Sequence, residues 1–425
     1  MSQDSPTPTS GPGDTNPSTQ FLAEDPDHPS PYAKKAIVAS ALGYAMDGFD
    51  LLILGFALTA ISLSLGLNQF EAGSLATITL LGAVVGGIGF GIMSDRIGRV
   101  KVLTYSIVLF AVFTGLTALA QDYWQIAIFR FIAGLGLGGE FGIGMTLAAE
   151  SWPAKLRARA TAYVALGWQG GVLLAALVSA PIITLWGWRG LFALGALPAL
   201  GAYMFRRQLE EPEKFVKMKS KTEKRGFPLG MLFADGPTSR ATLGITVLCS
   251  VQNFGYYGIM IWLPTYLSTQ FGYTLTKSAV WTAVTVLGMA IGIFVFGQLA
   301  DRIGRRPSFW IFQLGAVISV LTYSQLTSPG ALLIGGAIMG VFVNGMLGGY
   351  GALMAEIYPT PARATAQNVL FNIGRGVGGF GPLVMAALAS QYSFGFAIAL
   401  LAFIYVLDMV AMLVIPERRG TELID

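Results

Sequence analysis

The chain has 425 residues, of which 54% are hydrophobic and only 12% are charged, with a net charge of +4 and a mean hydropathy of +0.62. Because soluble domains carry about 25% charged residues, this composition excludes an ordinary soluble protein and indicates a polytopic membrane protein. The single cysteine, Cys249, excludes a disulfide within the chain and a cysteine metal cluster. The single histidine, His28, precedes the first apolar segment, so a proton relay inside the membrane must use carboxylates.

Residues 1–33 are rich in Pro, Ser, Thr, Asp and Gly and contain neither a basic region nor an apolar run. They predict a disordered cytoplasmic tail and not a signal peptide. Twelve apolar segments follow, each long enough to cross a bilayer as a helix. They span residues 36–65, 71–93, 101–120, 124–150, 158–186, 188–207, 239–270, 274–300, 308–327, 329–357, 365–391 and 393–416.

The charged stretch 208–238 is predicted to be a cytoplasmic linker between two six-helix bundles, residues 34–207 and 239–416, and residues 417–425 form a C-terminal tail. We therefore expect an all-α membrane protein with twelve transmembrane helices in two bundles.

Two motifs recur at one constant spacing. GIMSDRIGRVK at residues 91–101 recurs as GQLADRIGRRP at residues 297–307, an offset of 206 positions. The pattern E-x-x-P-x-x-x-R at residues 150–157 recurs at 356–363 with the same offset. Two matches at one offset indicate a duplicated half of roughly 200 residues, which is the internal symmetry expected of secondary transporters.

The basic residues predict the orientation. If both termini are cytoplasmic, all but four of the 27 lysines and arginines lie in the tails, the linker or the short loops after the second, fourth, eighth and tenth segments. The exceptions are Arg130, Arg189, Lys277 and Arg375. The positive-inside rule then predicts a multi-pass protein of the plasma membrane, the inner membrane of the cell, with both termini in the cytoplasm. The high isoelectric point has the same origin and does not indicate nucleic-acid binding.

The repeated pattern G-x-x-x-D-R-x-G-R resembles the signature loop of the major facilitator superfamily, and the resemblance covers residues 34–420. The motif DGFD at residues 47–50, RFIAGLGLGGEFG at 130–142 and ESWP at 150–153 resemble proton symporters of organic acids, of the sialate and lactate type, while the aromatic-acid type shares DGFD. The resemblance implies a monomer with two pseudo-symmetric six-helix bundles. It also implies a substrate held between them, with helices 1, 4, 7 and 10 lining the cavity.

Charge within a span is costly, so each intramembrane ionisable residue is a functional candidate. Asp47 and Asp50 share a helix face, and two like charges at this spacing do not both ionise easily. One of them is expected to hold the coupling proton, and the alternative is an aspartate that only bonds the backbone. Glu140 is a second proton site or the partner of Arg375. Arg130 is expected to pin the backbone, Asp47 or Asp50, and in the resembling family an arginine at this place is linked to proton transfer.

Arg375 offers a forked donor that matches a carboxylate. The 206-residue offset places it opposite Gln169, so the two are predicted to clamp an organic anion, and Trp168 beside Gln169 could stack on the ligand. The alternative is a permanent ion pair of Arg375 with Glu140 or an aspartate. Further substrate contacts are predicted from polar and aromatic side chains of the seventh and tenth segments, namely Gln252, Asn253, Tyr256, Tyr257 and Asn344. Asp408 falls on a helix that the resemblance turns toward lipid, and nothing in the sequence accounts for it.

The repeated loops are predicted to form a conformational gate. Its expected members are Asp95, Arg96, Arg99, Glu150, Asp301, Arg302, Arg305 and Glu356. The aspartates would cap helix N-termini across the bundle interface, and the arginines would pair with the glutamates to latch the outward-open state. Because the latch must break in each cycle, we expect ion pairs of the strength found on protein surfaces.

These patterns predict proton-coupled symport of a small organic monocarboxylate by alternating access, with protons as the coupling ion and no other cofactor. One alternative is a drug or metabolite efflux antiporter, which GWQGG at 167–171 disfavours because it lacks the proline of the antiporter motif, although a similar sequence occurs at 378–382. Another is a sugar or polyol carrier, which would not need Arg375. An enzyme is disfavoured because no nucleophile with a base and no metal cluster is evident.

Overall fold

The computed structural model describes residues 28–424, apart from 207–208, 213–214, 217–227 and 274. Most of the predicted N-terminal tail, much of the linker, residue 274 of the eighth predicted segment and the last residue lie outside the described residues. The helices are α1 (Pro31–Leu65), α2 (Gln69–Ile97), α3 (Arg99–Thr117), α4 (Tyr123–Ser151), η2 (Ala154–Leu156), α5 (Arg157–Arg206), α7 (Pro228–Met231), α8 (Gly236–Phe271), α9 (Leu275–Ile303), α10 (Arg305–Tyr323), α11 (Pro329–Gly345), α12 (Leu347–Ile357), α13 (Arg363–Gly378), α14 (Gly381–Gln391), α15 (Phe394–Ala411) and η3 (Met412–Val414).

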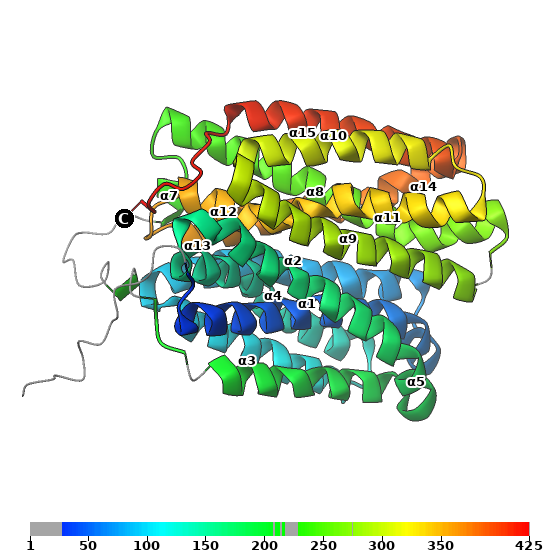
Figure 1. The fold of residues 1–425 in the computed structure, drawn as a ribbon. Coiled ribbons are helices and arrows are strands. Elements are labelled where there is room, and N and C mark those ends of the chain that lie inside the picture. Colours follow the sequence, from blue (N-terminus) through cyan, green and yellow to red (C-terminus); the bar gives the residue numbers. More distant parts are fainter. Residues whose placement is uncertain (1–27, 207–208, 213–214, 217–227, 274, 425) are drawn as a thin grey trace, which may run out of the picture.

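The helices form two halves that lie side by side with their axes roughly aligned (Figure 1). The first half contains α1 to α5, and the second contains α8 to α15. Nine stretches of the described residues are long and apolar enough to cross a membrane. The fold is the all-α membrane architecture of twelve helices in two six-helix halves that the apolar segments predict.

The helices break at a few positions within or between the predicted segments, and at two of these breaks a glycine or a proline fits the local backbone. Within α5 the backbone of Gly187 leaves the helical region, with φ 66° and ψ −177°, and the chain turns back there between the fifth and sixth predicted segments. Glycine adopts such a positive φ at no steric cost. The eleventh predicted segment is divided into α13 and α14, and Pro382 lies in the first turn of α14, where its missing N–H breaks no helical hydrogen bond. The tenth is divided into α11 and α12 at Met346.

Local capping defines several helix starts. Asn68 accepts a hydrogen bond from the backbone N–H of Glu71, and the Glu71 carboxylate accepts one from the N–H of Asn68, each at 2.9 Å, which is a capping box. At the start of α8, Asp235 accepts a hydrogen bond from the N–H of Thr238 at 2.7 Å. This hydrogen bond lowers the pKa of Asp235 below its usual value.

The two halves meet through symmetry-related helix pairs, in which α2 packs on α13 and α5 packs on α9. The repeated glycines Gly91 and Gly297 lie at these crossings. A Cβ at Gly91 would lie 3.1 Å from the Cα of Thr365, and one at Gly297 would lie 2.6 Å from the Cβ of Ala162. Any larger residue would separate the helices, so the two copies of the glycine serve close packing between the halves.

Candidate functional site

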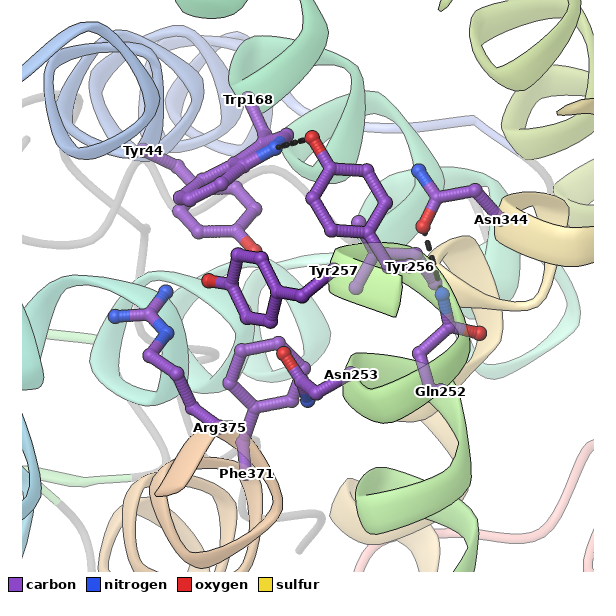
Figure 2. Close-up of a pocket in the computed structure, with 10 residues that line it drawn as sticks. Tyr44, Trp168, Gln252, Asn253, Tyr256, Tyr257, Asn344, Phe371 and Arg375 are labelled. Atoms are coloured by element: carbon purple, nitrogen blue, oxygen red, sulfur yellow. Dashed lines mark hydrogen bonds between the residues drawn. The ribbon is translucent and has the colours of Figure 1, made fainter. Parts of the chain in front are cut away.

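A cavity lies between the two halves and is lined by aromatic and amide side chains (Figure 2). Tyr44 of α1 and Trp168 of α5 belong to the first half, and the second half supplies the rest. The lining residues are Tyr44, Trp168, Gln252, Asn253, Tyr256, Tyr257, Asn344, Leu347, Phe371 and Arg375. This set includes every predicted substrate contact except Gln169. It adds the aromatic rings of Tyr44 and Phe371, which the sequence analysis did not single out because apolar segments contain many such rings.

Gln169 is buried on α5 and does not line the cavity. Both polar atoms of its side chain lack a hydrogen-bond partner among the described residues. The predicted clamp of Gln169 with Arg375 is therefore not formed, and the Trp168 ring lies 5.5 Å from the Arg375 guanidinium carbon instead. Neighbouring helical residues point in directions about 100° apart, so the repeat offset located the correct turn of the helix but the wrong side chain.

Arg375 is buried and pairs with Asp47 across the interface between the halves. Its Nη2 donates to Oδ2 of Asp47 at 3.0 Å, and its guanidinium carbon also lies 5.5 Å from the Phe371 ring. Arg375 Nε and Asp47 Oδ1 have no hydrogen-bond partner among the described residues. Of the ion-pair partners considered for Arg375, the structure shows an aspartate, Asp47.

Asp50 has a different environment from Asp47. Arg130 Nη1 donates to Asp50 Oδ1 at 2.9 Å, and its Nη2 donates to Oδ2, so the guanidinium holds the carboxylate with both prongs. The hydroxyl of Thr114 also donates to Asp50 Oδ1 at 2.9 Å. Arg130 thus pins Asp50 inside the first half. Glu140 lies elsewhere in that half and accepts a hydrogen bond from the Ser106 hydroxyl at 2.6 Å.

Aromatic rings and amides enclose the cavity. Phe141 of α4 stacks on Phe371 of α13, with ring centroids 3.6 Å apart and planes at 15°, so the two halves touch beside the cavity. The indole N–H of Trp168 donates to the Tyr256 hydroxyl at 3.2 Å, which forms a second bridge between the halves. Gln252 Nε2 donates to Asn344 Oδ1 at 2.7 Å, and the other polar atom of each amide lacks a partner among the described residues. Asn253 also lines the cavity, and its Nδ2 donates to the carbonyl of Cys249 at 2.9 Å.

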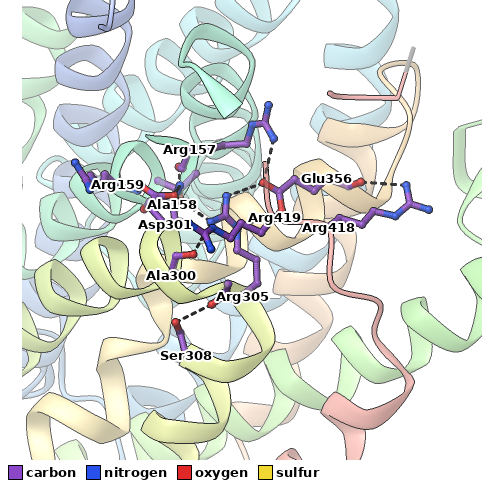
Figure 3. A network of polar contacts seen from close by, with 12 residues as sticks. Arg157, Ala158, Arg159, Ala300, Asp301, Arg305, Ser308, Glu356, Arg418 and Arg419 are labelled. Atoms are coloured by element: carbon purple, nitrogen blue, oxygen red, sulfur yellow. Dashed lines mark hydrogen bonds and ion pairs between the residues drawn. The ribbon is translucent and has the colours of Figure 1, made fainter. Parts of the chain in front are cut away.

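At one end of the interface, the repeated aspartates cap helices of the opposite half. Asp95 of the first half accepts hydrogen bonds from the N–H groups of Ala364 and Thr365 at the start of α13, at 3.2 and 2.7 Å. Asp301 of the second half accepts from the N–H groups of Ala158 and Arg159 near the start of α5, each at 3.0 Å (Figure 3). Each half is thus joined to the other by a carboxylate at a helix N-terminus, where the helix dipole favours negative charge.

The repeated glutamates each bridge two arginines, one from each half. Glu150 lies 3.0 Å from Arg99 Nε and 2.7 Å from Arg363 Nη1. In the symmetric copy Glu356 joins Arg305 at 2.7 Å and Arg157 at 3.0 Å (Figure 3). Arg157 and Arg363 were not among the predicted gate residues, although both end the repeated E-x-x-P-x-x-x-R motif.

The gate differs from its prediction in two further respects. Arg96 and Arg302 are exposed and lie outside the buried network. The pairs themselves are buried and not of the surface kind, because the ends of helices from both halves cover them. Burial of an ion pair costs desolvation energy, but removal of one partner is strongly destabilising because it leaves the other charge buried and unpaired. The closed gate is therefore stable only while every charged member keeps its partner.

The last residues of the chain close this end further. The carbonyl of Ile424 accepts hydrogen bonds from Thr360 N–H and Arg363 Nη2, each at 2.9 Å. The Leu423 side chain is buried against Ala149 and Ala355, one from each half. Nearby, Asn368 Oδ1 of α13 accepts a hydrogen bond at 3.0 Å from the N–H of Gly142 in α4. The interface is therefore closed on the side where the C-terminus lies.

Two duplicated six-helix halves that enclose a buried polar cavity, closed at one end by symmetric ion-pair networks, define a membrane transporter and not an enzyme. The family model of the Major Facilitator Superfamily matches residues 40–286 and 271–423, so the chain belongs to this superfamily.

The chain matches known transport proteins along nearly their whole length. A protein from Haemophilus influenzae described only as a metabolite transport protein is 63% identical over 401 residues, which cover 92% of this chain and 98% of that protein. A cis,cis-muconate transport protein from Acinetobacter baylyi is 29% identical, with 91% and 95% covered. The structure of the proton:xylose symporter XylE superposes with a TM-score of 0.78 at 20% identity, over 93% of this chain and 98% of that one, and thus shares the fold.

Proposed function

We propose that this transporter is a symporter of the plasma membrane that imports a small organic carboxylate together with a proton, with both termini in the cytoplasm. The observation behind this proposal is the Arg375–Asp47 pair, a buried cation in an aromatic cavity whose only charged partner among the described residues is one carboxylate. A substrate carboxylate can take the place of that partner. The muconate transport protein among the relatives supports a carboxylate substrate.

The charges of the cavity provide the coupling. When a substrate carboxylate binds Arg375, Asp47 loses its ion-pair partner and is left as a buried charge, which is costly. A proton on Asp47 removes this cost. Since Arg130 holds Asp50 as a separate, neutral pair, the total charge of the cavity stays constant only if one proton enters with each monocarboxylate. Asp47 is then the coupling residue, and Arg130 and Asp50 keep the neighbouring charge out of the exchange.

Neutralisation also frees the two halves to move. The Asp47–Arg375 pair crosses the interface, and breaking it by separation alone would expose two opposite charges to a low dielectric. The substrate carboxylate pairs with Arg375 and the proton neutralises Asp47 before the two halves separate. The halves can then rock around the cavity while the gate of Glu150 and Glu356 opens, as in alternating access.

Uptake into proteoliposomes tests the proposal. A panel of radiolabelled carboxylates and sugars is offered with and without an inward proton gradient to the wild type, to Arg375→Gln, and to Arg189→Gln, an exposed arginine outside the cavity, as the matched control. We expect one acid to accumulate only with the gradient, and this accumulation to disappear in Arg375→Gln alone. Entry of a neutral sugar, unchanged transport by Arg375→Gln, or accumulation driven only by an outward gradient would overturn carboxylate import.

A further inference from the structure

A second buried carboxyl group lies in the other half of the protein, away from the cavity. Asp408 of α15 is fully buried and faces the interior of the second half and not lipid. Gln313 Nε2 of α10 donates to its Oδ2 at 3.0 Å. Among the described residues Asp408 has no cationic partner, which separates it from Asp47, Asp50 and the gate carboxylates.

The side chains that interact with Asp408 from α8, α10, α12 and its own helix are uncharged. They are Gln313 of α10, Cys249 of α8, Tyr350 of α12 and Tyr405 of its own helix. Tyr350 already donates its hydroxyl to the carbonyl of Leu248 at 3.0 Å. An ionised carboxylate in such surroundings would lack both water and a counter-charge, which is among the most costly arrangements in a protein interior.

The hydrogen-bond donors and acceptors around Asp408 also favour a protonated carboxyl group. Three buried atoms of this cluster lack partners among the described residues, namely Asp408 Oδ1, Gln313 Oε1 and Tyr405 Oη. With Asp408 ionised, they comprise two pure acceptors and a single hydroxyl donor. A proton on Asp408 turns Oδ1 into a second donor and leaves Gln313 Oε1 as the one pure acceptor, so that the cluster no longer holds more pure acceptors than donors.

The cluster lies directly behind the helix that lines the cavity. The backbone of α8 at Gly255 touches the Tyr405 hydroxyl so closely that a Cβ there would collide with it. Cys249 of α8 also interacts electrostatically with Asp408. The same helix presents Gln252 to the cavity, so a movement of α8 on substrate binding would alter the surroundings of Asp408.

From this geometry we infer that Asp408, Gln313 and Tyr405 form a second proton-binding site, located in the C-terminal half, whose proton is exchanged as α8 moves. A proton from water binds Asp408 Oδ1, and its return to water, when the movement of α8 admits water, leaves the carboxylate. The inference rests on the proposed function only in that transport is coupled to protons, and it does not depend on whether the solute is an acid.

Infrared spectroscopy of the protein in lipid vesicles tests proton binding. Spectra of Asp47→Asn are compared with Asp47→Asn/Asp408→Asn, so that a C=O band of a protonated carboxyl in the first cannot come from Asp47. We expect a band that the second variant lacks. Gln313→Leu, made alone in the wild-type chain, should shift the band because it removes the hydrogen bond to the Asp408 carboxyl. This measurement keeps Asp408 in place, so it does not depend on whether Asp408→Asn folds. An identical band with and without Asp408 overturns the inference.

The number of protons moved per solute tests exchange. We expect the ratio measured in proteoliposomes to fall by one proton in Asp408→Asn relative to the wild type. An unchanged ratio shows a permanently bound structural proton and overturns exchange, while the proposed symport stands. If wild-type uptake ignores the proton gradient, the proposed function and the exchange both fail, and the infrared band alone decides whether Asp408 binds a proton.

Discussion

Arg375 of the second half donates a hydrogen bond to Asp47 of the first half at 3.0 Å, whereas Asp50, one helical turn further along α1, is held by Arg130 within the first half. The two aspartates of the DGFD motif thus have different ion-pair partners although they share a helix face. The pair of Asp47 must break when the halves separate. The pair of Asp50 lies inside one half and can persist throughout the cycle.

Asp47→Asn should remove the proton that the substrate carboxylate requires. The neutral amide cannot take up or release a proton, and it leaves Arg375 free to bind the substrate carboxylate. We expect exchange of labelled for unlabelled substrate across the membrane to continue, while gradient-driven accumulation falls to the level that the proton proposed at Asp408 can drive alone, or to equilibrium in Asp47→Asn/Asp408→Asn. Both are measured in proteoliposomes. Loss of exchange together with accumulation would show that Asp47 is needed for binding or folding and not for coupling.

Arg130→Gln should destabilise the protein, because it leaves the Asp50 carboxylate buried without its cation. Removal of one partner of a buried pair costs about 3–5 kcal/mol. The double variant Arg130→Gln/Asp50→Asn should recover most of this loss, since it restores a neutral hydrogen-bonded pair. Thermal unfolding in detergent measures both. Equal stability of the single variant and the wild type would mean that the Asp50–Arg130 pair contributes nothing to the fold.

Much of the architecture could be predicted because it is encoded along the helix axis. Twelve apolar runs define twelve spans, and the 206-residue repeat identifies symmetric partners such as Asp95 and Asp301 at symmetric helix ends. The burial of the gate could not be predicted, because it depends on helix ends and a tail from distant parts of the chain. Leu423, for example, contacts residues of both halves.

The direction in which a side chain points around its helix axis was predicted less well than its position along the axis. Gln169 and Trp168 are neighbours in sequence, yet only Trp168 faces the cavity. Asp408 was assigned to a lipid-facing helix, yet it points inward to Gln313. The direction of a side chain around a helix depends on which other helix packs there, and two helices far apart in sequence leave no local pattern that records this.

Gly142→Ala should disfavour closure of the interface. A Cβ at Gly142 of α4 would collide with the backbone and side chain of Asn368 on α13. Overpacking of this kind costs about 1–3 kcal/mol, so we expect the open form to become about tenfold more populated. The alkylation rate of a cysteine introduced at Ala149, in a Cys249→Ala background, measures opening. Gly170→Ala, where nothing lies within 4 Å of the added atom, is the matched control; equal rates in both variants would contradict this prediction.

Glu356→Gln should open the same end by a different route. The change leaves Arg157 without a carboxylate among the described residues and removes one of two partners of Arg305. Loss of a buried partner costs about 3–5 kcal/mol in the closed form only, so alkylation at the introduced cysteine should accelerate more than tenfold. Glu71→Gln changes the same side chain at a helix cap far from the gate, where glutamine still completes the capping box. Acceleration by both variants alike would point to general destabilisation.

Removal of residues 421–425 should weaken the gate while it keeps both partners of each Glu150 and Glu356 ion pair. The tail supplies the Ile424 carbonyl to Thr360 and Arg363, and it places the Leu423 side chain between the two halves. Burial of a leucine side chain stabilises by about 1.5–3 kcal/mol, so the truncated chain and Leu423→Ala should both increase alkylation at the introduced cysteine about tenfold or more, with the truncation having the larger effect. Ile424→Ala keeps the carbonyl and removes an exposed side chain, and should therefore change little. If truncation leaves the alkylation rate at the wild-type value, the tail only rests on a gate that closes by its ion pairs alone.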